Sequence, residues 1–205
     1  MMSITPGKVG EVWKAWFLRD LQGVDVTQTT SIVITERVTD VLALSGFALL
    51  GTVIFGRTSV VPLAVGCLLI IGILLLQWRT FLKEVINRLQ SVSVIRNYAE
   101  QIQSFYEATY ALFLFKPLSF GVAAGIVAWG LEAVAFWIIL QGFGIDIPLS
   151  RTLFVYGVGI LIGAISTLPG GLGTTEASMT GLLLAFGYSE ALAVSAVLLI
   201  RAGTL

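Results

Sequence analysis

The stretch that decides the fold is Pro117–Leu140, PLSFGVAAGIVAWGLEAVAFWIIL, whose 24 residues carry a single charge at Glu132. A helix needs about 20 apolar residues to cross the hydrocarbon core of a bilayer. Apolar side chains would cover every side of this helix, a pattern that suits lipid and leaves no face for water. The stretch therefore predicts a membrane-spanning helix.

The rest of the chain has the same character. Of its 205 residues, 57% are hydrophobic and 12% are charged, with a mean hydropathy of +0.94. Soluble domains have about 25% charged residues. We therefore expect an all-α polytopic membrane protein with about four full spans, the others being Val38–Phe55, Val60–Trp78 and Thr152–Leu168. The helical pattern of the first of these begins as early as Val26.

The composition excludes several kinds of chemistry. The chain has no histidine, which excludes histidine acid–base chemistry and most zinc sites, and its one cysteine, Cys67, cannot form a disulfide within the chain. Twelve basic and twelve acidic residues cancel, and no phosphate-binding loop motif is present. We expect no cofactor, no metal, no nucleic-acid partner and no catalytic residue. The sequence favours a protein that is not an enzyme but leaves that question open.

An amphipathic pattern covers Arg79–Phe113, where apolar residues recur every three to four positions. It predicts one or two helices on the membrane surface, with a charged loop as the alternative. Lysine and arginine accumulate on the cytoplasmic side of membrane proteins. We therefore expect the connector 79–116 and the N-terminal Pro-Gly motif to face the cytoplasm. The basic residues assigned to that side are Lys8, Lys14, Arg19, Arg79, Lys83, Arg88, Arg96 and Lys116.

The chain contains a weak internal repeat. Its first half, about 3–78, has the motif Pro6-Gly7-Lys8-Val9-Gly10-Glu11, and its second half, about 117–205, has Pro169-Gly170-Gly171-Leu172-Gly173-Thr174-Thr175-Glu176. Each motif is followed by a short apolar segment and a glycine, and Arg37 and Arg201 each lie fourteen residues beyond that glycine. We interpret the chain as one membrane domain, 1–205, built from two halves joined by the connector.

Breaks of this kind point to substrate sites in transporters. Proline removes a backbone donor and glycine permits unusual dihedral angles, so the freed backbone groups need partners inside protein or beside a polar cavity. A helix that begins after such a break directs unpaired N–H groups outward and favours an anion such as phosphate. Gly10–Leu21 and Thr174–Phe186 are too short to cross the bilayer, so we expect re-entrant or interfacial helices. Ordinary surface turns are the alternative.

Charges within the spans are costly, at about 2.5–3.5 kcal/mol each on insertion scales, and usually functional. Glu36, Arg37 and Asp40 share one arc of a helix, and the i, i+3 spacing predicts an ion pair between Arg37 and Asp40. Arg201 has Ile200 and Thr204 at the corresponding positions. It is therefore expected to be a bare arginine that could receive a phosphate. A structural salt bridge, or a charge at the membrane interface, is the alternative.

Glu132 is the lone charge of its span and is flanked by Trp129 and Trp137. An unpaired carboxylate there would be protonated or matched to a basic residue of another helix. We expect the tryptophans to serve as anchors at the membrane interface.

The two Pro-Gly motifs, with Glu36-Arg37-x-x-Asp40 after the first and Leu199-Ile200-Arg201 after the second, resemble the membrane region of the lysylphosphatidylglycerol synthase family. Its members are often called flippase-like integral membrane proteins. The resemblance covers essentially the whole chain. It implies a multi-pass protein of the plasma (inner) membrane that moves an aminoacylated phospholipid or a polyprenyl-linked lipid between leaflets, and a chain that is a fragment of a longer one. In bifunctional relatives, a separate soluble domain performs aminoacyl transfer.

Three hypotheses follow. The leading one is a lipid flippase or transporter core, whose partners are membrane lipids. The second is the membrane half of a lipid-modifying enzyme such as a phosphatidylglycerol lysyltransferase, with a soluble transferase domain or another membrane subunit as partner. The third is a non-catalytic scaffold. The candidate lipid-binding or transport residues are Pro6, Gly7, Lys8, Gly10, Glu11, Glu36, Arg37, Asp40, Glu132, Pro169, Gly170, Gly171, Gly173, Glu176 and Arg201.

Overall fold

The computed structural model describes residues 26–55, 67, 71, 84 and 99–205. Within these residues the regular structure is entirely helical, which confirms the predicted all-α class. The helices are α2 (Val26–Phe55), α6 (Ala99–Leu112), α7 (Phe115–Gly142), α8 (Leu149–Ile165), the 3₁₀ turn η2 (Pro169–Gly171), α9 (Thr174–Ala185) and α10 (Glu190–Thr204).

Three of the four predicted spans fall on described helices. Helix α7 contains the whole of Pro117–Leu140 and, among the described residues, is the one helix both long and apolar enough to cross a membrane. Helix α2 begins at Val26, as its pattern indicated. Helix α8 is a shorter apolar helix that ends at Ile165, three residues before the predicted Leu168. Of the fourth predicted span, Val60–Trp78, the structure describes Cys67 and Ile71 alone, and the N-terminal Pro-Gly motif lies outside the described residues. The repeat therefore stays a prediction.

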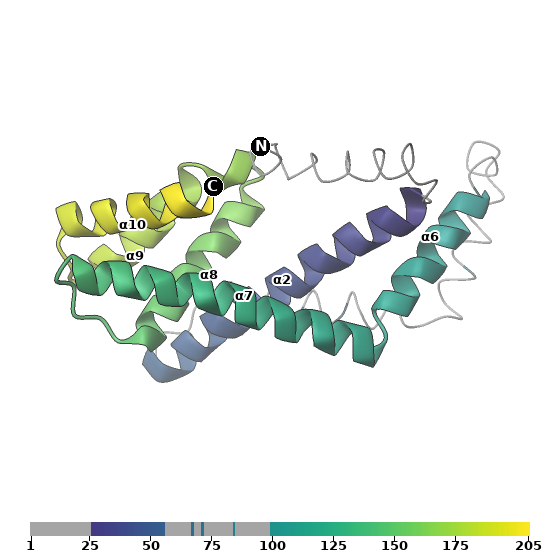
Figure 1. Cartoon of the computed structure of the whole chain (residues 1–205), viewed down its shortest axis with the longest axis horizontal. Coiled ribbons are helices and arrows are strands. Elements are labelled where there is room, and N and C mark those ends of the chain that lie inside the picture. Colours follow the sequence, from purple (N-terminus) through teal and green to yellow (C-terminus); the bar gives the residue numbers. More distant parts are fainter. Residues whose placement is uncertain (1–25, 56–66, 68–70, 72–83, 85–98) are drawn as a thin grey trace.

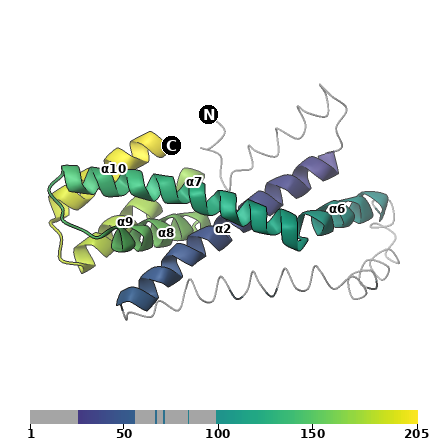
Figure 2. The same cartoon turned by 60° about the horizontal axis from the view of Figure 1, so that its bottom comes forward.

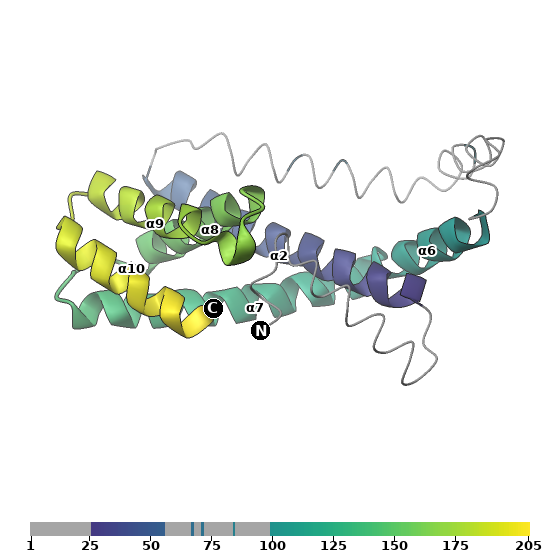
Figure 3. The ribbon, with the colours of Figure 1, turned by 90° about the horizontal axis from the view of Figure 1, so that it is seen from above.

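The two longest described helices, α2 and α7, cross each other obliquely (Figure 1). Helix α2 also packs against α8 and α6, and α8 packs against α9. Turned views show α8, α9 and α10 gathered at one end of α7, with α6 at the other end (Figures 2 and 3). The apolar core therefore lies where α2, α7, α8, α9 and α10 meet, and it includes Phe136, Leu140, Tyr156 and Val197.

Helix α6 confirms the amphipathic pattern over its own length. Tyr106, Thr109 and Phe113 are buried, whereas Gln103 and Glu107 are exposed. Its buried face packs against α2, and the Thr109 hydroxyl donates a hydrogen bond to Ser31 Oγ at 3.2 Å. In α6, the apolar stripe predicted for a surface helix therefore packs against α2. Its position relative to the membrane stays a prediction.

Glycines allow α7 to approach α2 closely. A Cβ added at Gly121 would lie 3.0 Å from Cγ2 of Thr39, and one at Gly125 would lie 3.3 Å from Cβ of Ala43. Two small residues four positions apart on one helix are typical of close helix pairs in membranes. The crossing of α2 and α7 therefore depends on these glycines, a signal present in the sequence that our sequence analysis did not use.

A second glycine pair brings α8 against α9. A Cβ at Gly159 would overlap the side chain of Met179, and one at Gly163 would overlap Oγ1 of Thr175. Gly163 and Gly159 are again four positions apart. This close approach holds the first turn of α9 against α8, beside the Pro-Gly-Gly turn.

Replacing Gly163 with alanine is expected to destabilise the protein by about 1–3 kcal/mol, the usual cost of overpacking a tight contact. Gly181 is the matched control, because it also lies in a helix but a Cβ there would meet none of the described residues within 4 Å. Gly181→Ala should be neutral or stabilising by up to about 1 kcal/mol through helix propensity. Denaturant titration of both variants in detergent, followed by circular dichroism, measures the difference. Equal stabilities of the two variants would contradict the close contact of α8 with α9.

Candidate functional site

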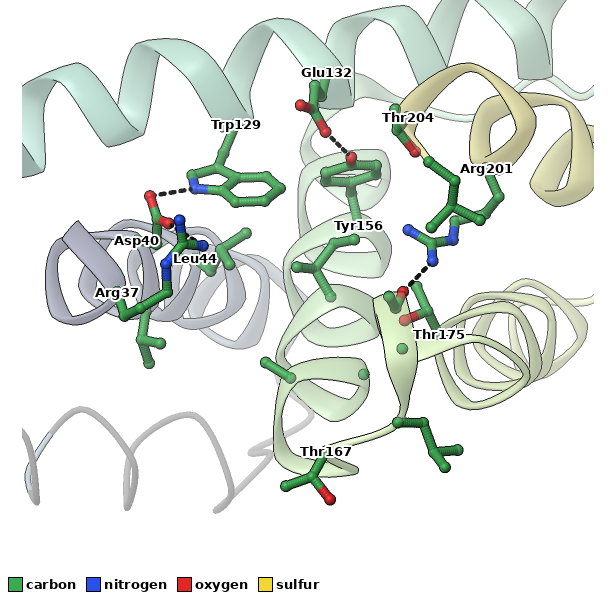
Figure 4. A pocket seen from close by; sticks show the side chains of 18 residues that line it. Arg37, Asp40, Leu44, Trp129, Glu132, Tyr156, Thr167, Thr175, Arg201 and Thr204 are labelled. Atoms are coloured by element: carbon green, nitrogen blue, oxygen red, sulfur yellow. Dashed lines mark hydrogen bonds and ion pairs between the residues drawn. The ribbon is translucent and has the colours of Figure 1, made fainter. Parts of the chain in front are cut away.

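A cavity of about 500 Å³ lies where α2, α7, α8, α10 and the Pro-Gly-Gly turn meet (Figure 4). Apolar side chains such as Leu44 and Ile160 form part of its wall. Charged and polar residues of α2, α7, α8, α9, α10 and the loop before Pro169 also line it. These polar lining residues are Arg37, Asp40, Trp129, Glu132, Tyr156, Thr167, Thr175, Arg201 and Thr204. Pockets between the helices of a bundle, with a few convergent polar groups, are typical binding sites.

On the α2 side of the cavity, Arg37 lies between two carboxylates. Its Nη1 is 3.2 Å from Oδ2 of Asp40, which confirms the predicted i, i+3 pair, and its Nη2 is 2.7 Å from Oε1 of Glu36. Trp129 donates a hydrogen bond from Nε1 to Oδ1 of Asp40 at 3.0 Å. Both oxygens of Asp40 therefore have a partner. Glu36 is more exposed than Asp40, with 56% against 18% of the side chain accessible, and does not line the cavity.

Trp129 was expected at the membrane interface. In the structure it lines the cavity, and its hydrogen bond to Asp40 joins α7 to α2. Its position relative to the membrane stays a prediction. Trp137, the other tryptophan of α7, donates to the carbonyl oxygen of Ile147 at 2.9 Å. Both indole N–H groups thus have partners within the fold, as tryptophan usually does when it is buried.

Glu132 accepts a hydrogen bond from the Tyr156 hydroxyl, across the contact between α7 and α8. Within the part of the chain that the structure describes, no basic side chain lies at ion-pair distance from Glu132. The sequence left open a proton or a basic partner, and the structure adds a neutral phenol that is fully buried. A tyrosine in the middle of an apolar helix needs a partner for its hydroxyl, and this was the available signal for Tyr156.

Arg201 is 6% exposed and is bound by two groups from the preceding turn and helix. Its Nε is 2.7 Å from Oε1 of Glu176, and its Nη2 donates a hydrogen bond to the carbonyl oxygen of Gly170. The prediction of a bare arginine was therefore wrong. Its acidic partner comes from the first turn of α9, 25 residues earlier, where the periodicity of α10 gives no information.

Glu176 also caps the N-terminal end of α9. Its Oε2 accepts a hydrogen bond from the Gly173 N–H at 2.6 Å, which caps the helix. Burial alone would raise the pKa of the Glu176 carboxyl. The hydrogen bonds and charge of Arg201, together with the backbone N–H groups of Glu176 and Gly173, outweigh that effect and hold this pKa below its ordinary value. Helix α9 has only 12 residues and is too short to span the bilayer, as predicted.

The predicted break at the second Pro-Gly motif is confirmed. Gly170, Gly171 and Gly173 have φ angles of 60°, 66° and 82°, values that favour glycine. Thr167, just before the turn, has φ of 56°, which is uncommon for a β-branched residue. The backbone therefore has positive φ angles at four positions around this break. Three of these residues, Thr167, Gly170 and Gly171, line the cavity.

The structure brings together part of the predicted set. Arg37, Asp40, Glu132, Gly170, Gly171 and Arg201 line the cavity, and Glu176 holds Arg201 from outside the lining. Pro169 and Gly173 belong to the turn and the cap behind it. Pro6, Gly7, Lys8, Gly10 and Glu11 lie outside the described residues. The lining residues that sequence analysis did not identify as site residues include Trp129, Tyr156, Thr167, Thr175 and Thr204.

The apolar composition, the helical structure of the described residues and the long apolar helix α7 define an α-helical membrane protein. Residues 1–205 match the model of the family described as the lysylphosphatidylglycerol synthase TM region. The chain belongs to this family, and the resemblance inferred from the two Pro-Gly motifs is confirmed.

Two relatives extend this result. A UPF0104 membrane protein of Methanothermobacter thermautotrophicus is 28% identical over 210 residues, covering 94% of this chain and 62% of the relative. A UPF0104 membrane protein of Pyrococcus horikoshii is 25% identical over 226 residues, covering 97% of this chain and 68% of the relative. The chain thus spans about two thirds of the length of these relatives. No solved structure matches it significantly.

Proposed function

We propose that this protein moves a phospholipid or polyprenyl-linked lipid between the leaflets of the membrane, with the polar headgroup passing through the charged cavity. The observation that carries the proposal is the cavity itself, in which arginines and carboxylates of separate helices meet in an otherwise apolar protein. Charged groups are costly in hydrocarbon, so a polar site lowers the barrier for a headgroup while the acyl or prenyl chains stay in lipid. An aminoacylated phosphatidylglycerol is one candidate substrate.

The second half of the chain offers groups suited to an anionic headgroup. The Nε and Nη2 of Arg201 are bound within the fold, but its Nη1 donates to none of the described residues. The hydroxyl oxygen of Thr204 is shielded from solvent and has no hydrogen-bond partner among them. A phosphate would satisfy these groups together.

The test is transport by the purified chain in proteoliposomes, with fluorescent phosphatidylglycerol and a fluorescent polyprenyl phosphate as probes. Arg37→Gln should lower the rate about tenfold or more, because a hydrogen bond to a charged group contributes about 1.5–3 kcal/mol and 1.4 kcal/mol is a factor of ten. Quenching of outer-leaflet fluorescence by a membrane-impermeant reductant measures the rate.

Arg151→Gln is the matched control, because Arg151 lies on α8, stacks over the ring of Phe186 and does not line the cavity. This variant should keep the wild-type rate. A wild-type protein that moves neither lipid would contradict translocation. A wild-type protein that is active while Arg37→Gln is equally active would contradict the role of the cavity.

A second candidate function is the membrane part of a lipid-modifying enzyme. The family description favours it, because that description names the membrane region of a synthase. This candidate predicts that lipid extracts of a strain lacking the gene lose one lipid species. Translocation alone predicts that the same species persists but accumulates in one leaflet.

A further inference from the structure

The structure distinguishes Glu132 from the other carboxylates near the cavity. Glu36 and Asp40 are both paired with Arg37, and Glu176 is paired with Arg201. Glu132 points into the cavity, and its partner among the described residues is the neutral Tyr156 hydroxyl (Figure 4). It also lies near the middle of α7, far from either end of the helix. Among these four carboxylates, Glu132 is therefore the one whose partner in the described residues carries no charge.

We infer that Glu132 is a proton-binding site and that lipid movement is coupled to the proton gradient through it. This inference rests on the proposed translocation and adds its energy source. One proton binds to a carboxylate oxygen of Glu132 from water on one side of the membrane. The same proton leaves to water on the other side, so no other reactant is needed.

The partner of Glu132 suits a group that changes protonation state. A phenol hydroxyl both donates and accepts hydrogen bonds, whereas an ionised carboxylate only accepts. In the structure Tyr156 donates to Glu132, and this is the arrangement that an ionised carboxylate requires. When Glu132 is protonated, its own O–H can donate to the phenol oxygen. The hydrogen bond therefore survives both states, and neither leaves a buried polar group unpaired, which would cost about 1–3 kcal/mol.

The surrounding charges explain how lipid and proton would be coupled. Around the cavity, α2 contributes Arg37 and Asp40, α8 contributes Tyr156, and α10 contributes Arg201, which Glu176 of α9 holds from outside the lining. A phosphate bound to Arg201 would add negative charge to the cavity that also contains Glu132. That charge would favour the protonated form of Glu132, and by linkage a proton on Glu132 would favour the bound phosphate. Anionic lipid and proton should therefore move together in the same direction.

The transport experiment uses the full chain in proteoliposomes with a pH difference of about one unit across the membrane, which corresponds to a tenfold ratio of proton activity. Wild-type protein should drive the fluorescent anionic lipid toward a leaflet asymmetry approaching tenfold, and dissipation of the gradient should abolish this asymmetry. Glu132→Gln, which keeps the shape but cannot titrate, should give none. Glu107→Gln is the matched control and should respond as wild type does, because Glu107 is an exposed carboxylate of α6 that accepts a hydrogen bond from Gln103 and lies outside the cavity lining.

A second readout separates failure of this inference from failure of the proposed function. Infrared difference spectra of the wild-type protein, with and without inorganic phosphate, should show a new band of a protonated carboxyl that is missing in Glu132→Gln. An active wild type whose gradient response persists in Glu132→Gln would overturn the proton site. An inactive wild type would overturn translocation, and the infrared band would then decide alone whether Glu132 binds a proton together with an anion.

Discussion

Arg201→Ala is expected to lower the free energy of unfolding by about 3–5 kcal/mol, the usual cost of removing one partner of a buried ion pair. The variant leaves Glu176 half-buried with no basic partner among the described residues, and it frees the carbonyl oxygen of Gly170. Both effects act on the Pro-Gly-Gly turn and the first turn of α9. Unfolding in detergent with increasing denaturant, followed by circular dichroism, measures the loss.

A double-mutant cycle assigns this effect to the pair. Glu176→Leu should be similarly destabilising because it leaves Arg201 buried without its carboxylate. The double variant Arg201→Ala with Glu176→Leu should lose markedly less stability than the sum of the two single losses. Additive losses in the cycle would show that the two side chains stabilise the fold independently, contrary to the geometry of the ion pair.

Asp40→Ala is expected to cost about 1.5–3 kcal/mol, the contribution of hydrogen bonds to a charged group. Asp40 accepts from the Trp129 indole and pairs with Arg37, so it joins α7 to α2 at the cavity. Asp40→Asn should cost less, because an amide oxygen can still accept from Trp129 while the attraction to Arg37 is lost. The same denaturant titration measures both variants.

The neighbouring carboxylate provides the control for Asp40. Glu36 also pairs with Arg37, but its side chain is 56% exposed and it contacts no other helix through that pair. Exposed ion pairs contribute about 0–1 kcal/mol, so Glu36→Ala should be close to neutral. Equal losses of unfolding free energy in Glu36→Ala and Asp40→Ala would contradict a stabilising role of the hydrogen bond from Trp129 to Asp40, which joins α7 to α2.

Much of the fold could be predicted because the relevant forces act locally along the chain. The apolar run of Pro117–Leu140 predicted α7, and the periodicity starting at Val26 predicted α2. The break at Pro169-Gly170-Gly171 could be located because proline and glycine restrict or widen backbone dihedral angles wherever they occur. The pair of Arg37 with Asp40 followed from the geometry of a single helix.

The partners within the cavity depend on which helices pack together, and the periodicity of one helix contains no such information. Arg201 seemed unpaired because its own helix offers no acid, yet α9 brings Glu176 to it. Trp129 seemed an interface anchor because only the packing of α7 on α2 places Asp40 beside it. The partner of Tyr156 could not be predicted, because its hydroxyl meets Glu132 only where α8 packs against α7.

The sequence by itself determined that this is a helical membrane protein of a lipid-related family, and it identified most of the charges that matter, because hydropathy and motifs are properties of contiguous residues. The tertiary structure decided which partner each charged side chain has. It left Arg37, Asp40 and Glu176 in ion pairs, and it gave Glu132 a phenol as partner. The reason is that Coulomb attraction and hydrogen bonding fall off over a few ångströms, so only the folded chain determines which groups they join.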